Sequence, residues 1–149
     1  MDQTVKVWGV ASKSLVSTCG VRYNRDEDVG HTNMVNAVAA MPDGQRILSG
    51  GRDITVRVWL LDGTLENTFL GMHDEMVLAL VALPDNQHAL SGSGEKTVKL
   101  FNVDDGAVLR TFTHHTGPVF SLTLLPDGLR FVSGSHDGTR IAYHGLWVK

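Results

Sequence analysis

The sequence has little of several features that define common protein classes. Its 149 residues include a single cysteine, Cys19, so no intrachain disulfide can form and a reducing compartment, cytosolic or nuclear, is expected. No apolar run approaches the ~20 residues that a membrane-spanning helix needs. The N-terminus has no basic stretch followed by an apolar one. Neither a signal peptide nor a membrane anchor is therefore predicted.

An excess of charge of either sign is also missing. Thirteen Lys and Arg residues against sixteen Asp and Glu give a formal net charge of -3. This balance gives no reason to expect binding to nucleic acid or to an anionic membrane. Apolar residues make up 42% of the chain, as in ordinary globular proteins. Proline is scarce, with 4 residues, whereas 16 glycines predict many tight turns.

The chain contains an internal repeat with a period of 42 residues. Three Pro-Asp turns mark it, at Pro42, Pro84 and Pro126. Independent anchors that keep one period indicate a repeated structural unit. The other residues that the same shift superimposes are the histidines His31, His73 and His115, the serines Ser49, Ser91 and Ser133, the threonines Thr55, Thr97 and Thr139, and the aromatic residues Trp59, Phe101 and Tyr143.

Each unit is predicted to form four short antiparallel strands. The first strands are apolar runs at 34–41, 76–83 and 118–125, a pattern typical of strands that are covered on both faces. A Pro-Asp turn, a second strand, a glycine-rich bend and a third strand follow. Asp62-Gly63 and Asp105-Gly106 predict the hairpins that lead into the fourth strands. No segment has a helical period, so the fold is predicted to be all-β, built of four-stranded propeller blades.

These motifs resemble the WD-repeat β-propeller family, and the resemblance covers essentially the whole chain. The matching pieces are Ser-Gly-Gly-Arg-Asp-Ile-Thr-Val-Arg-Val-Trp at 49–59, Ser-Gly-Ser-Gly-Glu-Lys-Thr-Val-Lys-Leu-Phe at 91–101 and Ser-Gly-Ser-His-Asp-Gly-Thr at 133–139. Residues 2–8, Asp-Gln-Thr-Val-Lys-Val-Trp, match the same stretch entered part-way. No Trp is followed by Asp here, so the spacing carries the resemblance.

The chain is predicted to hold thirteen strands in one incomplete, open propeller domain at 1–149. Its parts are the end of one blade plus an inserted loop at 1–31, blades at 32–73 and 74–115, and an incomplete blade at 116–149. Closed propellers need roughly four to eight blades, so we expect a fragment of a larger propeller whose isolated chain self-associates. The insertion, within 20–30, is interpreted as a tolerated surface loop or, alternatively, as a partner contact.

The resemblance implies a hydrogen-bonded tetrad in each blade. Its members are a His, a Ser, an acidic residue and an aromatic residue. In the second blade Phe101 has no donor and Glu95 is expected to be one methylene too long, so apolar packing should hold that blade. By position, the three sets are His31, Ser49, Asp53 and Trp59; His73, Ser91, Glu95 and Phe101; and His115, Ser133, Asp137 and Tyr143.

The tetrad residues are interpreted as structural and not as catalytic. A His, a Ser and an Asp also make up a nucleophilic triad, but an active site has no reason to recur three times on a structural period. The remaining histidines, His88, His114, His136 and His144, lack the spacing of a zinc site. No catalytic residue, metal or cofactor is predicted.

The resemblance also implies one rim of the propeller as the partner-binding face. Its positions flank the first valine of each first strand and precede the acidic residue of each bend. They are Met34, Asn36, Arg52, Met76, Leu78, Gly94, Pro118, Phe120 and His136. The predicted function is a non-catalytic scaffold that binds other proteins or peptides. Two alternatives remain: these residues pack against loops, or the chain is a regulatory or targeting segment of a multidomain enzyme.

Overall fold

The computed structural model describes residues 3–20 and 30–143, with the side chains of 140–143 excluded. This part of the chain folds into strands and turns, and no helix in it is long and apolar enough to cross a membrane. The inserted segment predicted within 20–30 lies outside the described residues apart from its two end glycines. The fold therefore has to be understood from its antiparallel sheets.

In this part of the chain, thirteen strands form four antiparallel sheets. The strands of the two full sheets pair in chain order, β3-β4-β5-β6 and β7-β8-β9-β10. The first sheet holds β1 (Val5–Gly9) and β2 (Ser14–Cys19). The full sheets hold β3 (Val35–Ala40), β4 (Arg46–Gly51), β5 (Val56–Leu60) and β6 (Leu65–Phe69), then β7 (Val77–Ala82), β8 (His88–Ser93), β9 (Val98–Asn102) and β10 (Val108–Phe112). The last sheet holds β11 (Val119–Leu124), β12 (Phe131–Ser135) and β13 (Arg140–Tyr143). The predicted all-β fold of four-stranded antiparallel blades in an open arrangement is confirmed.

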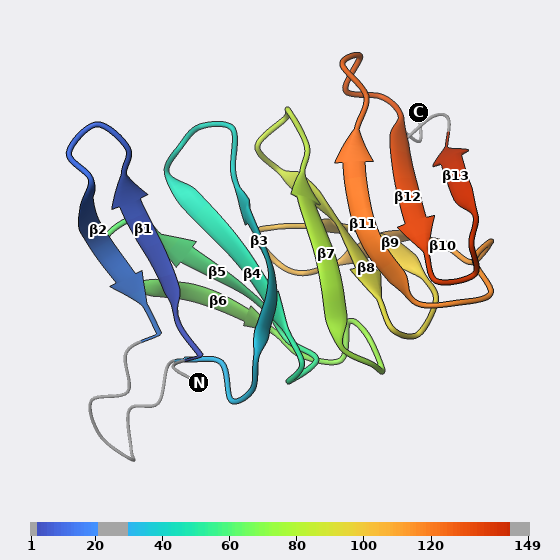
Figure 1. The fold of residues 1–149 in the computed structure, drawn as a ribbon, viewed down its shortest axis with the longest axis horizontal. Helices are drawn as coiled ribbons and strands as arrows, with labels where there is room; N and C mark the ends of the chain where they lie inside the picture. The colour runs from blue at the N-terminus through green and yellow to red at the C-terminus, as the bar shows by residue number, and fades with distance from the viewer. Residues whose placement is uncertain (1–2, 21–29, 144–149) are drawn as a thin grey trace.

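The four sheets stand side by side as an arc, from β1–β2 at one end to β11–β13 at the other (Figure 1). In the last two sheets the first strand packs on the sheet before it: β7 contacts β3 and β4, and β11 contacts β7 and β8. Between the second and third sheets, Leu48, Val56 and Val58 meet Val77 and Phe101 in the largest apolar layer. Similar layers separate the other neighbouring sheets. Burial of apolar side chains between sheets therefore holds the arc together.

A glycine in the second strand of each full blade allows this close stacking. A Cβ atom added at Gly50 would lie 2.5 Å from Cγ1 of Val77 in the next blade, and one at Gly92 would lie 2.9 Å from Cγ1 of Val119. Neither distance is compatible with a normal van der Waals contact. The Ser-Gly pair of the repeat thus serves two purposes, because its glycine receives the valine of the following blade while its serine points into the polar network described below.

The first strands differ in how well they are covered. We predicted cover on both faces for all three, and this is wrong for β3 and β11. Val38 is 57% exposed and Phe120 is 54% exposed, whereas Leu80, which holds the position of Val38 in the middle blade, is 8% exposed. Leu80 packs against the second strand of the sheet before it, near Gly50. Among the described residues, the sheet before Val38 has only β1 and β2, and β11 belongs to the last sheet of the arc. Cover therefore depends on neighbouring blades and not on the apolar run itself.

Candidate functional site

A buried polar network ties the start of the first full blade to its bend. Oγ of Ser49 accepts a hydrogen bond from the Trp59 indole N–H at 2.7 Å and lies 2.7 Å from Nε2 of His31. The other ring nitrogen of His31 lies 2.9 and 3.0 Å from the two carboxylate oxygens of Asp53. The indole, the hydroxyl and the imidazole are fully or almost fully buried. All four residues of the first predicted set are thus joined in one continuous chain of hydrogen bonds.

The electrostatics of this network fix its protonation. Burial lowers the pKa of His31, against the opposing effect of Asp53, so the ring is neutral near pH 7. Its Nδ1–H then donates to the carboxylate, and Nε2 accepts the Ser49 hydroxyl proton. Burial works against ionisation of Asp53, but hydrogen bonds from the backbone N–H of Thr32, from His31 and from Thr55 outweigh it and lower the pKa of Asp53.

In the second blade, a longer carboxylate makes the same connection. Oε1 of Glu95 lies 2.7 Å from Nδ1 of His73, and Nε2 of His73 lies 2.7 Å from Oγ of Ser91. The expectation that Glu95 is too long to close this contact is therefore wrong. Its second oxygen accepts the backbone N–H of Asp74 at 2.7 Å, so the extra methylene is accommodated by the position of the bend. As expected, Phe101 brings no hydrogen-bond donor.

Lys99 is a member of the second network that the sequence did not point to. Its Nζ lies 2.8 Å from Oε1 of Glu95 and donates to the carbonyl of Met72 at 2.6 Å. Burial opposes ionisation of Glu95, but donors from the backbone of Asp74 and from Lys99, Thr97 and His73 lower its pKa to about 2. An internal ion pair thus stands in the blade that lacks the indole.

The third network contains the same His–Ser and His–Asp contacts. Nε2 of His115 lies 2.7 Å from Oγ of Ser133, and Nδ1 lies 3.0 Å from Oδ2 of Asp137. A hydrogen bond from the Thr139 hydroxyl lowers the pKa of Asp137 well below its usual range. Burial opposes this shift, and hydrogen bonds from backbone N–H groups add to it. The side chain of Tyr143 lies outside the described residues. Thr55 and Thr97 occupy the position of Thr139 in the other two blades, and each donates to the carboxylate of its own blade. In the sequence, a Thr two residues after each acidic residue indicates this role.

These networks position the rim above them. In each blade, a backbone N–H in the bend donates to the carbonyl just before the first strand: Arg52 to Met34 at 2.8 Å, Gly94 to Met76 at 3.0 Å and His136 to Pro118 at 3.0 Å. Six of the nine predicted rim residues are thereby held in pairs. The serines beneath them have no exposed surface, so they are not accessible as nucleophiles.

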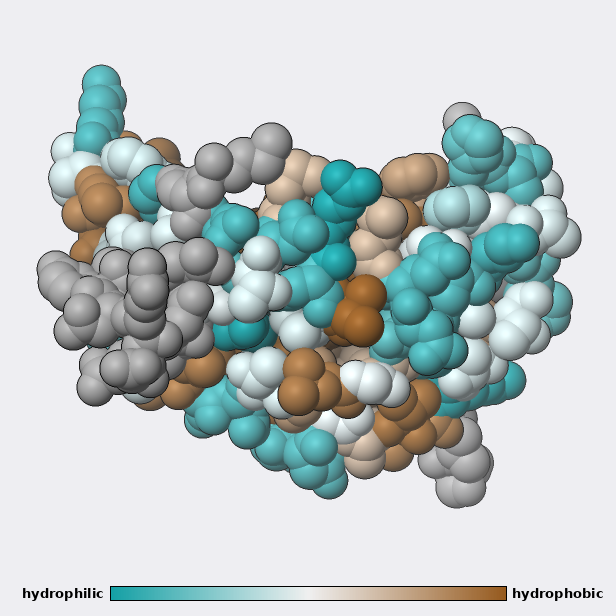
Figure 2. Space-filling model, turned by 90° about the horizontal axis from the view of Figure 1, so that it is seen from below, coloured by the Kyte–Doolittle hydropathy of each residue, from teal (hydrophilic) through white to brown (hydrophobic). Residues whose placement is uncertain are grey.

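The rim combines exposed, half-buried and buried positions. Arg52, Phe120, His136 and Asn36 are exposed, although the amide of Asn36 donates to the Val77 carbonyl of the next blade at 2.9 Å. Figure 2 shows the molecule from this side, with apolar surface near the centre among hydrophilic side chains. The Phe120 and His136 rings meet edge to face, 6.3 Å apart. Of the remaining positions, Gly94 is buried, and Met34, Met76, Leu78 and Pro118 are half-buried.

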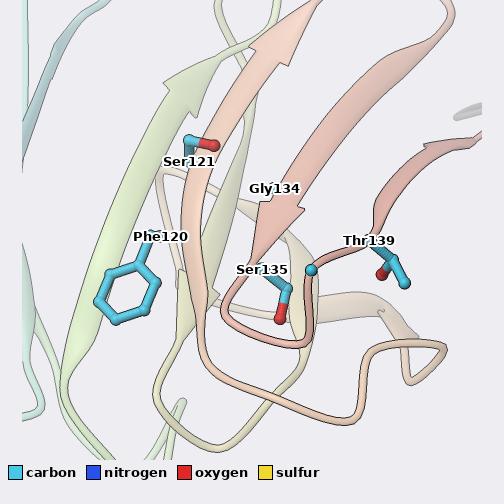
Figure 3. Close-up of a pocket in the computed structure, with 6 residues that line it drawn as sticks. Phe120, Ser121, Gly134, Ser135 and Thr139 are labelled. Atoms are coloured by element: carbon cyan, nitrogen blue, oxygen red, sulfur yellow. The ribbon is translucent and has the colours of Figure 1, made fainter.

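A hollow lies beside the rim on the outer face of the last sheet. Its walls are Phe120 and Ser121 from β11, Gly134 and Ser135 from β12, and the bend with Thr139 (Figure 3). The Ser135 hydroxyl donates to the carbonyl of Gly117 at 2.8 Å, so it is engaged in the fold. Within residues 3–20 and 30–139, no three His, Cys, Asp or Glu side chains gather in a way that could hold a metal ion.

Four-stranded antiparallel blades that stack in an arc and repeat a buried His–Ser–carboxylate network define a β-propeller protein. The sequence profile of the WD domain, G-beta repeat, matches residues 24–59, 63–102 and 106–139, well over half of the chain. The chain belongs to the WD-repeat family.

Solved and curated relatives agree with this assignment. The crystal structure of the WD40 β-propeller domain of Doa1 superposes with a TM-score of 0.81 and 29% identity, covering 95% of this chain and 44% of that one. The small ribosomal subunit protein RACK1 of Neurospora crassa is 38% identical over 61 residues, 41% of this chain and 16% of that protein. The nuclear distribution protein PAC1 of Candida tropicalis is 31% identical over 74 residues, 44% of this chain and 15% of that protein. The chain thus spans under half the length of each.

Proposed function

We propose that this chain is part of a larger WD-repeat propeller that acts as a non-catalytic protein–protein interaction scaffold. The observation that carries the proposal is the rim, where three bends are fixed to three first strands by one repeated backbone hydrogen bond. Contact residues that are held on a rigid frame lose little conformational entropy when a partner binds. The chain covers only a small part of the length of each relative, which supports the proposal that it belongs to a larger propeller.

The side chains of the rim indicate the chemistry of the partner. Phe120 offers an exposed aromatic ring, the half-buried Met76 and Leu78 offer adaptable apolar surface, and Arg52 offers a charged donor. Aromatic residues, methionine and arginine are the types enriched at protein interfaces. A protein or peptide with an apolar segment fits this surface. The net charge of -3 argues against nucleic acid and anionic membranes as partners, and the lone buried cysteine is consistent with a cytoplasmic or nuclear protein.

Paired rim substitutions test the scaffold function. Arg52→Glu combined with Phe120→Asp should abolish capture of partner proteins from a cell extract while leaving the far-UV circular dichroism spectrum unchanged. The matched control is Leu129→Asp, because Leu129 is 48% exposed and lies in the turn between β11 and β12, away from the rim. Partners that the wild type and the control capture, and the double variant does not, support the proposal. Unchanged capture by the double variant would place the binding surface elsewhere.

The alternative, a regulatory or targeting segment of a multidomain enzyme, is supported by the small share of the relatives that the chain covers. The coding sequence on both sides of this chain distinguishes the two. Further WD repeats would support the scaffold, whereas an adjoining catalytic domain would support the alternative. A catalytic role for the described residues themselves finds no support, since the hydroxyls of the three networks are buried.

A further inference from the structure

The tight turn of each bend holds one residue at a positive φ, directly after the acidic position of the repeat. In the first full blade, the N–H of Ile54 donates to the carbonyl of Gly51 at 3.3 Å, and the same turn hydrogen bond recurs in the other two bends. The fold therefore dictates the backbone at this place, whichever side chain it carries. The residues that occupy it are Gln3, Ile54, Lys96 and Gly138, with φ values of 54°, 61°, 75° and 80°.

Ile54 suits this backbone conformation worst of the four. Glycine has no Cβ and adopts a positive φ freely, whereas a β-branched residue there is a genuine outlier. Its branched Cβ crowds the backbone, which destabilises the folded state. The side chain of Ile54 is also 38% exposed, so its burial does little to offset this strain. Backbone strain of this kind concentrates at binding and active sites.

The bend of the first full blade presents two exposed side chains around a fixed carboxylate. His31 and the backbone N–H of Thr32 hold Asp53 in the buried network, and Arg52 before it and Ile54 after it are exposed. Within the part of the chain that the structure describes, the Arg52 guanidinium makes no hydrogen bond or ion pair. The other bends lack this combination of a cation and an apolar side chain, because the corresponding pairs are Gly94 with Lys96 and His136 with Gly138.

We propose that the bend at 52–54 determines the specificity of the rim and binds a peptide segment that carries a carboxylate beside an apolar residue. The carboxylate pairs with the unengaged guanidinium of Arg52, which can bind it through two parallel N–H groups. The apolar residue covers Ile54 and removes its exposed surface from water. Because Asp53 is fixed between them, the two contacts keep one spacing. This inference rests on the proposed function, since it names the partner chemistry of the same rim.

Short fluorescein-labelled synthetic peptides test the bend on the full chain. Each carries one Leu and one Asp at varied spacing in a Gly-Ser background, and matched peptides lack the Leu or the Asp. Fluorescence anisotropy should show saturable binding, at least about tenfold weaker when either residue is missing. Binding should weaken as salt rises, because salt screens the pairing with Arg52. The Arg52→Ala chain should lose about tenfold in affinity together with this salt dependence.

Substitutions of Ile54 separate binding from folding. Ile54→Asn should raise the urea midpoint of unfolding, because Asn tolerates a positive φ, as Asn86 does at 60°. The same change should weaken peptide binding at least about tenfold, because the apolar contact is lost. Ile54→Leu keeps an apolar side chain and should bind the peptide like the wild type. Lys96→Asn, the matched change in the next bend, should leave binding unchanged. A purely structural role of Ile54 would not move stability and binding in opposite directions.

Three results would overturn the proposal. They are the absence of saturable binding by every peptide, equal binding of the peptides without Leu or Asp, and an Ile54→Asn chain that binds like the wild type. The variant altered at both Arg52 and Phe120 tests the scaffold function separately. If it loses partner capture while Ile54→Asn captures normally, the scaffold function is supported and the role of this bend is contradicted.

Discussion

Trp59→Phe is expected to destabilise the protein by more than the smaller ring alone would, because it also removes the indole N–H donor. Trp59→Phe deletes the 2.7 Å hydrogen bond to Ser49, a contribution of about 1 kcal/mol. It also removes atoms from a fully buried ring between the first two sheets, which adds about 1–2 kcal/mol. We therefore expect a loss of about 2–3 kcal/mol in the free energy of unfolding, a larger effect than that of Phe101→Trp.

A double-mutant cycle isolates the hydrogen bond. Ser49→Ala alone leaves the Trp59 N–H buried without a partner, at a cost of about 1–3 kcal/mol. Because Trp59→Phe removes that N–H, the double variant should be more stable than the sum of the single effects by at least about 1 kcal/mol. Urea unfolding followed by circular dichroism measures all four proteins. Ser91→Ala is the matched control, since its blade already has Phe101 and no indole is left unpaired. Additive costs at Ser49 and Trp59, or equal costs at the two serines, would refute this reasoning.

Three further outcomes are expected. Burial lowers the folded-state pKa values of His31 and His73, so the unfolded chain binds more protons, and stability should fall as pH drops below about 6.5, the ordinary histidine pKa. Glu95 adds a second loss between about 4.5 and about 2, and an unfolding free energy that is flat with pH would contradict both. Gly50→Ala should cost about 1–3 kcal/mol because of its collision with the next blade, whereas Gly134→Ala meets only the movable Ser121 side chain and should change stability by less than about 0.5 kcal/mol; equal effects would argue against the stacking role. In size-exclusion chromatography with light scattering, the isolated chain should form oligomers or aggregates, and a sharp, thermally stable monomer peak at 16.2 kDa would show that the open ends are tolerated.

The strands and their order were predictable because each repeat carries its own turn chemistry. Pro-Asp turns, the glycine-rich bend and Asp-Gly hairpins define where the strands of the repeated blades end, and these signals are local. The cover of the strands was not predictable in the same way. Val38 and Leu80 stand at equivalent places in equally apolar runs, yet only Leu80 packs against the second strand of a neighbouring sheet. Burial of a strand is a property of its neighbours, which a local pattern does not contain.

The members of the polar networks were likewise predictable only in part. The residue types and the period predicted which side chains could meet, and the first network contains all four. The reach of Glu95 was misjudged because side-chain length was compared on a fixed backbone, whereas the bend places its carboxylate against both His73 and the backbone of Asp74. Lys99 was missed because it lies on a strand where charge alternates with apolar residues, a pattern that ordinarily indicates a solvated face.

The two full sheets have a consequence for how the molecule opens. β3–β6 and β7–β10 each have an apolar layer on both faces, whereas the sheets at the two ends of the arc have one each. In a linear array whose units contact only their neighbours, the free energy of local opening is greatest where both interfaces exist. The central strands should therefore be the last to exchange their amides, and opening should spread inward from β2 and β13. Resistance to local opening should thus rise from the ends of the chain toward the two full blades, which contain the networks of Asp53 and of Glu95.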